Sequence, residues 1–369
     1  MERTLAEPVT FEFSSGINPD HAEQLITRLA EEEAGARVVL RFTGYPYVNA
    51  GVGWRIGNAL RRFSGEPFEA HVPPMGTGEW FRTFTRSGLG IAIATHAGRI
   101  RCDGEDVTAK IQDFYLREPV RRDQNAVSFG DLHRGIGVNP EREDLFRDAF
   151  VTSLRKVNIW PTNFDRDRLR DIIKFAFEAI QNVYDHARRK PLPEGTRILS
   201  YFLLGYYKSI AGHPDPTGRL KGYGERLAAL TRRKRTDFMQ VCVNDDGVGI
   251  AARQSQNAEI YRGPIEEEEA AVREALRAHS SVKLRAQDCR IRGTAGEGYT
   301  YIDLCLRVLR AMAILRTGRL LAVLDGTNDA EPGFILVNRG LGYMPGTTLD
   351  VLIPIIKEGD GQPSLFPDE

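Results

Sequence analysis

Residues 171–187 read DIIKFAFEAIQNVYDHA and carry apolar side chains at a helical period. At about 100° per residue the segment is predicted to be an amphipathic helix, because its apolar positions share one face. Those positions are Ile172, Ala176, Ala179, Ile180, Val183 and Ala187. Glu178, Asn182 and Asp185 fall in a narrow stripe nearly opposite. Two carboxylates and an amide one turn apart can converge on a metal–phosphate group; the alternative is an ordinary solvated helix face.

Residues 239–250, MQVCVNDDGVGI, are predicted to form a β-branched strand that runs into a tight turn. Asp245 stands at the end of this strand, where its carboxylate can accept a hydrogen bond from an amine. Gly247 and Gly249 follow, and glycines let the backbone turn tightly and approach a ligand closely. Taken alone the motif is weak, because Asp-Gly and Gly-x-Gly also occur in ordinary turns.

A second glycine-rich stretch, GTAGEG at residues 293–298, precedes an amphipathic segment at 299–313. A loop of this kind leading into a helix presents backbone N–H groups and the positive end of the helix dipole to phosphates. Its glycines are Gly293, Gly296 and Gly298. Near the C-terminus, Gly346 and Thr347 open a final predicted strand, TTLDVLIP.

In this order, the four motifs resemble those of the GHKL (Bergerat-fold) ATP-binding domain, over residues 145–356. The superfamily includes gyrase-type topoisomerases, a heat-shock chaperone, mismatch-repair ATPases, sensor histidine kinases and anti-sigma-factor kinases. The resemblance implies an α+β sandwich in which a mixed sheet is covered by helices on one face. It also implies that the chain binds ATP and Mg²⁺.

The resemblance implies a role for each matched residue. Glu178 is expected to be the general base that activates the attacking water, and Asn182 the Mg²⁺ ligand. Asp245 is expected to read the adenine amine, supported by Thr347 through a water. The other expected ATP-binding residues are Asp185, Gly247, Gly249, Gly293, Gly296 and Gly298. The charged segment 260–292 is expected to be the lid over the nucleotide.

The N-terminal residues 1–125 are predicted to form a smaller α/β domain, because short apolar runs alternate with amphipathic stretches. Strands are expected at 8–13, 37–42, 68–72 and 89–95, and helices at 18–29, 53–63 and 79–85. Residues 38–63 are similar to the strand–loop–helix of STAS domains, but Val48-Asn49-Ala50-Gly51 lacks the phosphorylatable serine of that family. The resemblance implies a docking or regulatory module; an α/β domain of another family is the alternative.

Three further segments complete the predicted organisation. Residues 126–144 are polar and turn-rich and are interpreted as a linker, and the polar tail 357–369 is expected to be disordered. Between the first two ATP-site motifs, residues 198–207 predict an extra core strand and residues 220–230 a helix.

Composition excludes several classes of function. Fifty Lys and Arg residues balance fifty Asp and Glu residues, which argues against binding nucleic acid or anionic membrane by bulk electrostatics. No apolar run approaches the ~20 residues of a membrane helix, and no secretory signal is evident. The four cysteines are scattered, without the spacing of a zinc site or a disulfide framework. A cytoplasmic protein is expected.

The leading functional hypothesis is a Mg²⁺-dependent ATPase that acts as a nucleotide-controlled switch. An anti-sigma-type protein serine/threonine kinase and a non-hydrolysing, ATP-gated signalling or defence module are the alternatives. Autophosphorylation on histidine is not expected, since no histidine lies in the phosphoacceptor pattern. A protein partner encoded nearby and a nucleotide-dependent homodimer are expected. Gln362, Leu365 and Phe366 are similar to the peptide by which bacterial replication and repair proteins bind the sliding clamp.

Overall fold

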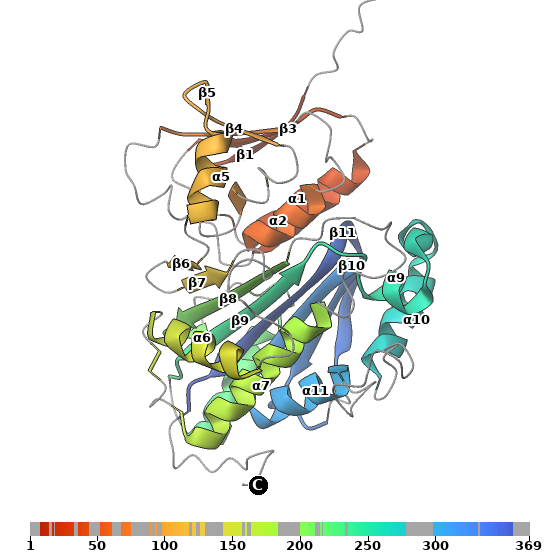
Figure 1. Cartoon of the computed structure of the whole chain (residues 1–369). Coiled ribbons are helices and arrows are strands. Elements are labelled where there is room, and N and C mark those ends of the chain that lie inside the picture. Colours follow the sequence, from red (N-terminus) through yellow and green to blue (C-terminus); the bar gives the residue numbers. More distant parts are fainter. Residues whose placement is uncertain are drawn as a thin grey trace, which may run out of the picture.

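The computed structural model shows an α/β protein with two sheets (Figure 1). The residues that it describes are 8–14, 17, 19–32, 36–43, 52–60, 68–74, 89–90, 93, 98–117, 120–122, 126–129, 143–156, 159–160, 164–183, 200–210, 215, 217–232, 235–277, 298–330 and 333–356. Among the described helices, none has the length and apolar composition that crossing a membrane requires.

The N-terminal sheet is parallel except at one edge. Its strands lie in the order β1 (Val9–Phe13), β2 (Val38–Phe42), β3 (Phe68–Val72), β4 (Arg99–Cys102) and β5 (Glu105–Asp106), and only β5 pairs antiparallel. The helices of this half whose full extent is described are α1 (Pro19–Glu31), α2 (Val52–Leu60) and α5 (Thr108–Arg117).

Most predicted elements of this half are confirmed, with one exception. The strands expected at 8–13, 37–42 and 68–72 and the helices expected at 18–29 and 53–63 are present as β1 to β3, α1 and α2. The strand expected at 89–95 is wrong, because Leu89, Gly90 and Ile93 are helical. A short apolar run of this length does not distinguish a strand from a buried helical turn. The helix expected at 79–85 lies outside the described residues.

The second sheet is antiparallel in every described pair, so the expected mixed sheet is wrong. Its strands lie in the order β10 (Met312–Asp325), β11 (Ile335–Pro354), β9 (Phe238–Asp245), β8 (Ser200–Tyr207), β7 (Ala126–Phe129) and β6 (Val120–Arg122). β7 lies within the segment interpreted as a linker, yet it pairs with β8. A four-residue strand is too short to give a periodic signal, so no strand was expected here.

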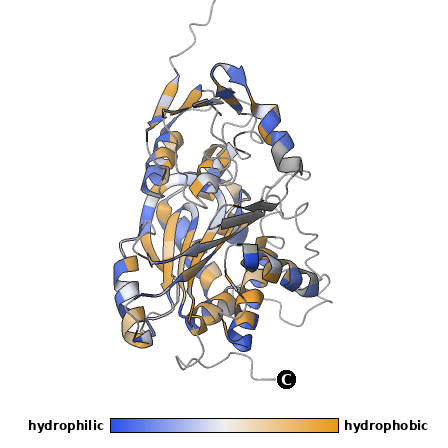
Figure 2. Ribbon diagram, turned by 90° about the vertical axis from the view of Figure 1, so that its left-hand side faces the viewer, coloured by the Kyte–Doolittle hydropathy of each residue, from blue (hydrophilic) through white to orange (hydrophobic). Residues whose placement is uncertain are grey.

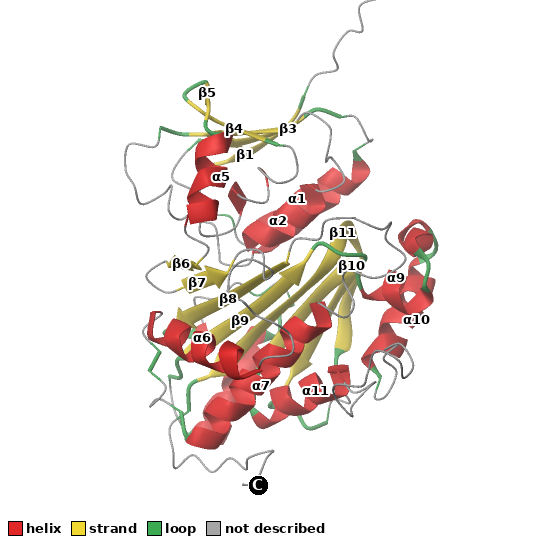
Figure 3. Cartoon of the chain, in the orientation of Figure 1, coloured by secondary structure: helices red, strands yellow, loops and turns green. Residues whose placement is uncertain are grey.

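Helices cover both faces of the second sheet, so the expected arrangement with helices on one face only is wrong. The helices are α6 (Glu143–Lys156), α7 (Arg166–Asn182), α8 (Leu220–Thr231), α9 (Ile250–Ser255), η5 (Ala258–Arg262), α10 (Ile265–Leu276) and α11 (Gly298–Val308). α6, α7 and α11 lie over one face (Figure 3). Ala313 and Leu315 of β10 join the core under these helices, whereas Met312 and Ile314 join a separate core with α8. Successive strand residues point to opposite faces, so α8 covers the other side.

The predicted helix at 171–187 is present as α7, and its apolar face is buried as far as the described residues extend. Asp165 begins the helix, because its side chain accepts a hydrogen bond from Arg168 N at 2.6 Å. The extra strand and helix expected at 198–207 and 220–230 are also present, as β8 and α8. Figure 2 shows the resulting pattern, with apolar residues along the strands of the second sheet.

β10 and β11 have an unusual course that matters for the site. β10 doubles back at Gly318, where φ is +54°, so that Gly326 N donates to Ala311 O at 2.8 Å. β11 pairs with residues 312–317 on one side of this hairpin and with residues 320–323 on the other. The intervening residues of β11, 340–346, therefore pass around the tip of the β10 hairpin, which we define as residues 317–320.

Candidate functional site

The candidate site centres on Asp245, at the C-terminal end of β9. Asp245 is buried, and its Oδ1 accepts a hydrogen bond from Gly247 N at 2.9 Å, which closes the turn predicted after the strand. In the sheet, Asp245 lies opposite Thr347 of β11. The structure therefore brings three of the sequence-predicted site residues together across two neighbouring strands.

Two glycines around Asp245 are required by close approaches of the chain to itself. Gly249 has φ of +77°, and a Cβ there would overlap the hydroxyl of Tyr261 and lie 3.1 Å from Thr317 Oγ1. Gly346 has φ of +76°, and a Cβ there would overlap the carbonyl oxygen of Asp245. Both positions thus combine a left-handed backbone with a lack of space. The motif predicts that Gly249 makes room for a ligand; the groups that approach it in the structure are the hydroxyls of Tyr261 and Thr317 and the carbonyl of Gly346.

Thr317 and Tyr261 hold the turn and were missed from the sequence. Thr317 Oγ1 accepts from Ile250 N at 3.1 Å and donates to Gly346 O at 3.2 Å. The Tyr261 hydroxyl donates to Val248 O at 2.7 Å. Burial raises the pKa of this hydroxyl well above its usual value, so it remains a donor. A threonine inside a strand and a tyrosine in a charged segment give no local signal of this role.

α7 brings Asn182 and Glu178 toward the same end of the sheet. In Figure 1, α7 crosses one face of the sheet, and its C-terminal end points to the end at which β9 finishes. Asn182 is only 9% exposed, so it does not lie on a solvated helix face. Glu178, one turn earlier, is partly buried. Asp185 lies outside the described residues.

The amide of Asn182 indicates that a polar group belongs beside it. Its Nδ2 is buried and has no hydrogen-bond partner among the residues that the structure describes. Leaving a buried donor unsatisfied costs about 1–3 kcal/mol, so such atoms normally face a partner, a water or a ligand. A side-chain amide also carries an oxygen, which is a ligand type that Mg²⁺ accepts.

The segments that are expected to bind phosphate are described only in part. A helix follows the glycine-rich stretch, as predicted; it begins one residue earlier than expected, at Gly298, and this helix, α11, packs against α7. The predicted helix at 299–313 ends earlier, at Val308, because β10 already begins at Met312. Gly293 and Gly296 lie outside the described residues, as do Gln362, Leu365 and Phe366 of the tail.

The first half of the expected lid is fixed to the core. η5 and α10 occupy residues 258–276, and Glu268 of α10 is fully buried. Its carboxylate accepts from Arg319 N at 2.6 Å and from Arg319 Nε at 2.7 Å. The rest of the segment that was expected to be the lid, residues 278–292, lies outside the described residues.

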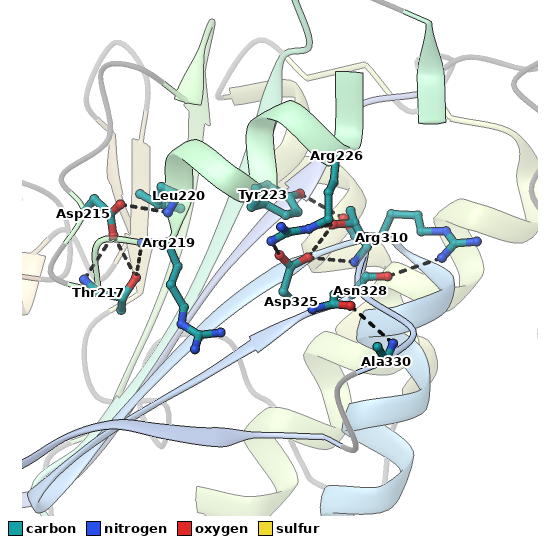
Figure 4. Close-up of polar contacts among 12 residues, drawn as sticks. Asp215, Thr217, Arg219, Leu220, Tyr223, Arg226, Arg310, Asp325, Asn328 and Ala330 are labelled. Carbon is teal, nitrogen blue, oxygen red and sulfur yellow. Dashed lines mark hydrogen bonds and ion pairs between the residues drawn. The ribbon is translucent and has the colours of Figure 1, made fainter. Parts of the chain in front are cut away.

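A second polar cluster lies at the end of β10 remote from the hairpin tip (Figure 4). Asp325 is buried and accepts hydrogen bonds from Thr327 N at 2.9 Å and Thr327 Oγ1 at 2.5 Å. It also pairs with Arg226 of α8, and Tyr223 of the same helix donates to Arg310 O at 2.9 Å. These groups satisfy one another and anchor α8 to the sheet, so we assign them a structural role.

No known protein family, curated protein or solved structure matches this chain. Among the described residues, no group of three or more His, Cys, Asp or Glu side chains is placed to hold a metal ion by itself. A Mg²⁺ ion held by one amide oxygen, waters and phosphate oxygens does not require such a group. The order of the four motifs and the geometry around Asp245 are the grounds for a functional proposal.

Proposed function

We propose that the chain binds ATP with Mg²⁺ at the C-terminal end of β9, hydrolyses it, and uses the bound nucleotide as a switch. The observation that carries the proposal is the meeting of Asp245, Gly346 and Thr347 at one point of the sheet. The buried amide of Asn182, on the helix that points to the same end, supports it.

Each residue has a role that its chemistry permits. The Asp245 carboxylate accepts a hydrogen bond from the adenine amine, while Gly247 N keeps its other side in place. The amide oxygen of Asn182 would hold Mg²⁺, which neutralises phosphate charge when bound. Glu178 takes the proton from the attacking water, a role that needs a carboxylate within hydrogen-bond reach of that water.

The proposal separates binding from turnover, and two variants test them. Asp245→Asn should weaken ATP binding about 10- to 100-fold, because a charge-assisted hydrogen bond contributes about 1.5–3 kcal/mol. Glu178→Gln should bind ATP normally and lose hydrolysis, because the amide cannot accept the proton. Calorimetry and phosphate release provide the two measurements.

Each variant has a matched control that removes a carboxylate away from the candidate site: one at the start of β9 and one on α8. Asp237→Asn removes an exposed carboxylate that accepts from Tyr206, at the other end of β9, and should leave ATP binding unchanged. Glu225→Gln, on the exposed side of α8, should leave turnover unchanged. Equal ATP affinity of wild type and Asp245→Asn would remove Asp245 from the site. Equal hydrolysis by wild type and Glu178→Gln would remove Glu178 as the base.

The same assays distinguish the alternative functions. If the γ-phosphate appears on a partner protein instead of in solution, the chain is a protein serine/threonine kinase. Tight binding without turnover, with or without a partner, would identify a non-hydrolysing ATP-gated module. Each outcome keeps the ATP site and changes only the fate of the γ-phosphate.

A further inference from the structure

The N-terminal half packs against the segment of β11 that passes around the tip of the β10 hairpin. α1 and α2 lie between the two sheets (Figure 1) and contact β11. Met344 of β11 is fully buried and belongs to the core of the N-terminal half. At Gly342, a Cβ would overlap the backbone of α1 at Thr27. The two halves therefore meet through close backbone packing, without room for side chains between them at this point.

A buried arginine ties α1 to this tip. Arg316 has no exposed side-chain surface, and its Nε donates to the Glu23 carboxylate of α1 at 3.1 and 3.2 Å. Its two terminal nitrogens donate to Gly318 O at 2.5 Å and to Gly342 O at 2.6 Å. Arg316 thus links α1, the tip of β10 and the passing segment of β11.

α2 reaches further, to the candidate adenine site itself. Asn58 is 3% exposed, and its Nδ2 donates to Asp245 O at 2.7 Å and to Pro345 O at 3.1 Å. Asp245 is the residue assigned to the adenine amine, and Pro345 directly precedes Gly346 and Thr347. One amide from the N-terminal half therefore bridges the two strand ends that carry the site.

We propose that Asn58 is a positioning residue for the nucleotide base, and that the N-terminal half is thereby built into the ATP site. The inference rests on the proposed function of Asp245. Asp245 and Pro345 are both buried, so their carbonyl oxygens need hydrogen-bond donors from the protein. The Asn58 amide supplies both hydrogen bonds, which sets the separation of β9 and β11 where Asp245 leaves the sheet. A shift of about 1 Å at such a point is enough to spoil recognition.

Binding of ATP should in turn favour the arrangement in which Asn58 of α2 is hydrogen-bonded to Asp245 and Pro345. The same ends of β9 and β11 contact α2 and would contact the nucleotide. The relationship is reciprocal: a ligand that binds one arrangement more tightly stabilises every contact that this arrangement contains. A partner that moves α1 and α2 would then alter nucleotide affinity. The N-terminal half would act on the site through Asn58 without contacting the nucleotide.

The test compares ATP with inosine triphosphate, in which a carbonyl replaces the adenine amine. Wild type should prefer ATP by about tenfold or more, the value of one charge-assisted hydrogen bond. Asn58→Ala and the isosteric Asn58→Asp should reduce this preference to within about threefold of unity, because Asp245 no longer meets the amine in register. A purely structural role would weaken both nucleotides equally and leave the ratio unchanged.

Glu23→Gln is the matched control on the same interface. It alters the partner of Arg316 but touches neither Asp245 nor Pro345, so it should lower thermal stability and retain the ATP preference. A wild-type chain that does not bind ATP would overturn both the proposed function and this inference. Wild-type preference for ATP that persists in folded Asn58→Ala and Asn58→Asp would overturn the inference alone.

A second measurement needs no substitution and applies if the Asn58 variants fail to fold. Hydrogen exchange of wild type should slow in α2 and at Gly346 and Thr347 when a non-hydrolysable ATP analogue is added. Exchange in α5, which lies away from the interface in Figure 1, should not change. Binding of the analogue without slower exchange in α2 would show that α2 does not sense the site and would overturn the inference.

Discussion

At the scale of single residues, the structure around Asp245 depends on backbone conformations that side chains would prevent. Gly346 and Gly249 both have positive φ, and both lie against neighbouring groups of the chain. The carboxylate of Asp245 and the hydroxyls of Thr317 and Tyr261 hold the turn between them. In the proposed ATP site, recognition of the base would therefore depend as much on the packed turn as on the Asp245 carboxylate.

Two glycines of β11 both have positive φ, but only one of them lacks space for a Cβ. Replacing each by alanine therefore distinguishes the destabilisation caused by backbone strain from that caused by steric overlap. Gly340 has φ of +74° and nothing within 4 Å of an added Cβ, whereas a Cβ at Gly346 meets the carbonyl of Asp245. Gly340→Ala should lower the free energy of unfolding by about 1–2 kcal/mol, the strain of a left-handed alanine. Gly346→Ala should cost at least about 2 kcal/mol more, because backbone must move.

Denaturant unfolding of both variants checks this difference, and ATP binding gives a second readout. The Gly340→Ala variant should bind ATP normally, whereas Gly346→Ala should lose affinity because the end of β9 is displaced. Equal destabilisation by the two substitutions would mean that the approach of Gly346 to Asp245 relaxes without cost.

At the scale of elements, α7 carries Glu178 and Asn182 near its C-terminal end, which points to the end of the sheet where β9 finishes. The helix is held at its other end by the Asp165 cap and by Arg168, which is buried. The guanidinium of Arg168 donates to Leu309 O at 2.9 Å and to Pro354 O at 2.8 Å, so it ties α7 to the ends of α11 and β11. Fixing the start of a helix fixes the position of residues farther along it.

Removing the cap of α7 should lower stability measurably. Asp165→Ala should cost about 1 kcal/mol, because Arg168 N loses the oxygen that satisfies it. Asp167→Ala is the control: Asp167 is in the same turn but forms an exposed pair with Arg170 at 3.2 Å, which contributes under about 0.5 kcal/mol. Chemical denaturation of the two variants measures both values, and a larger loss for Asp167→Ala would contradict the assignment of the cap.

At the scale of the whole molecule, the two sheets are coupled through one crowded interface. Met344 lies in the core of the N-terminal half, although β11 belongs to the second sheet. Arg316 and Asn58 add buried hydrogen bonds across the same boundary. A chain that shares core residues between its halves has no surface along which they can separate without exposing buried polar groups.

Thermal unfolding should therefore occur in a single cooperative transition. The N-terminal half cannot unfold first without exposing Met344 and breaking the contacts of Arg316, both of which also stabilise β11. Differential scanning calorimetry checks this, with Glu23→Gln as the variant that weakens the interface. Two resolved transitions in wild type would contradict the coupling; their appearance only in Glu23→Gln would agree with it.

Much of the candidate site was predictable because its signals are local. The period of the apolar residues in 171–187 predicted α7, and the run before Asp245 predicted β9. Glycines in a tight turn indicate either a left-handed backbone or a close approach of another group. Gly249 and Gly346 show both, because each has positive φ and neither has space for a Cβ. Each of these inferences uses residues that are neighbours along the chain, where spacing alone determines geometry.

Only the tertiary structure decided which distant residues complete the site. The hydrogen bonds that hold the turn join residues far apart in the sequence. Tyr261 lies 13 positions from its partner, Thr317 lies 67 and Asn58 lies 187, so no local pattern relates these residues to the turn. The sheet topology was likewise undetermined, since short strands and apolar runs satisfy more than one pairing. The sequence by itself determined where the chain turns and which faces are apolar. The tertiary structure decided which segments pack against those faces and turns. The segments that bury one another are distant in the sequence and come into contact only when the chain folds.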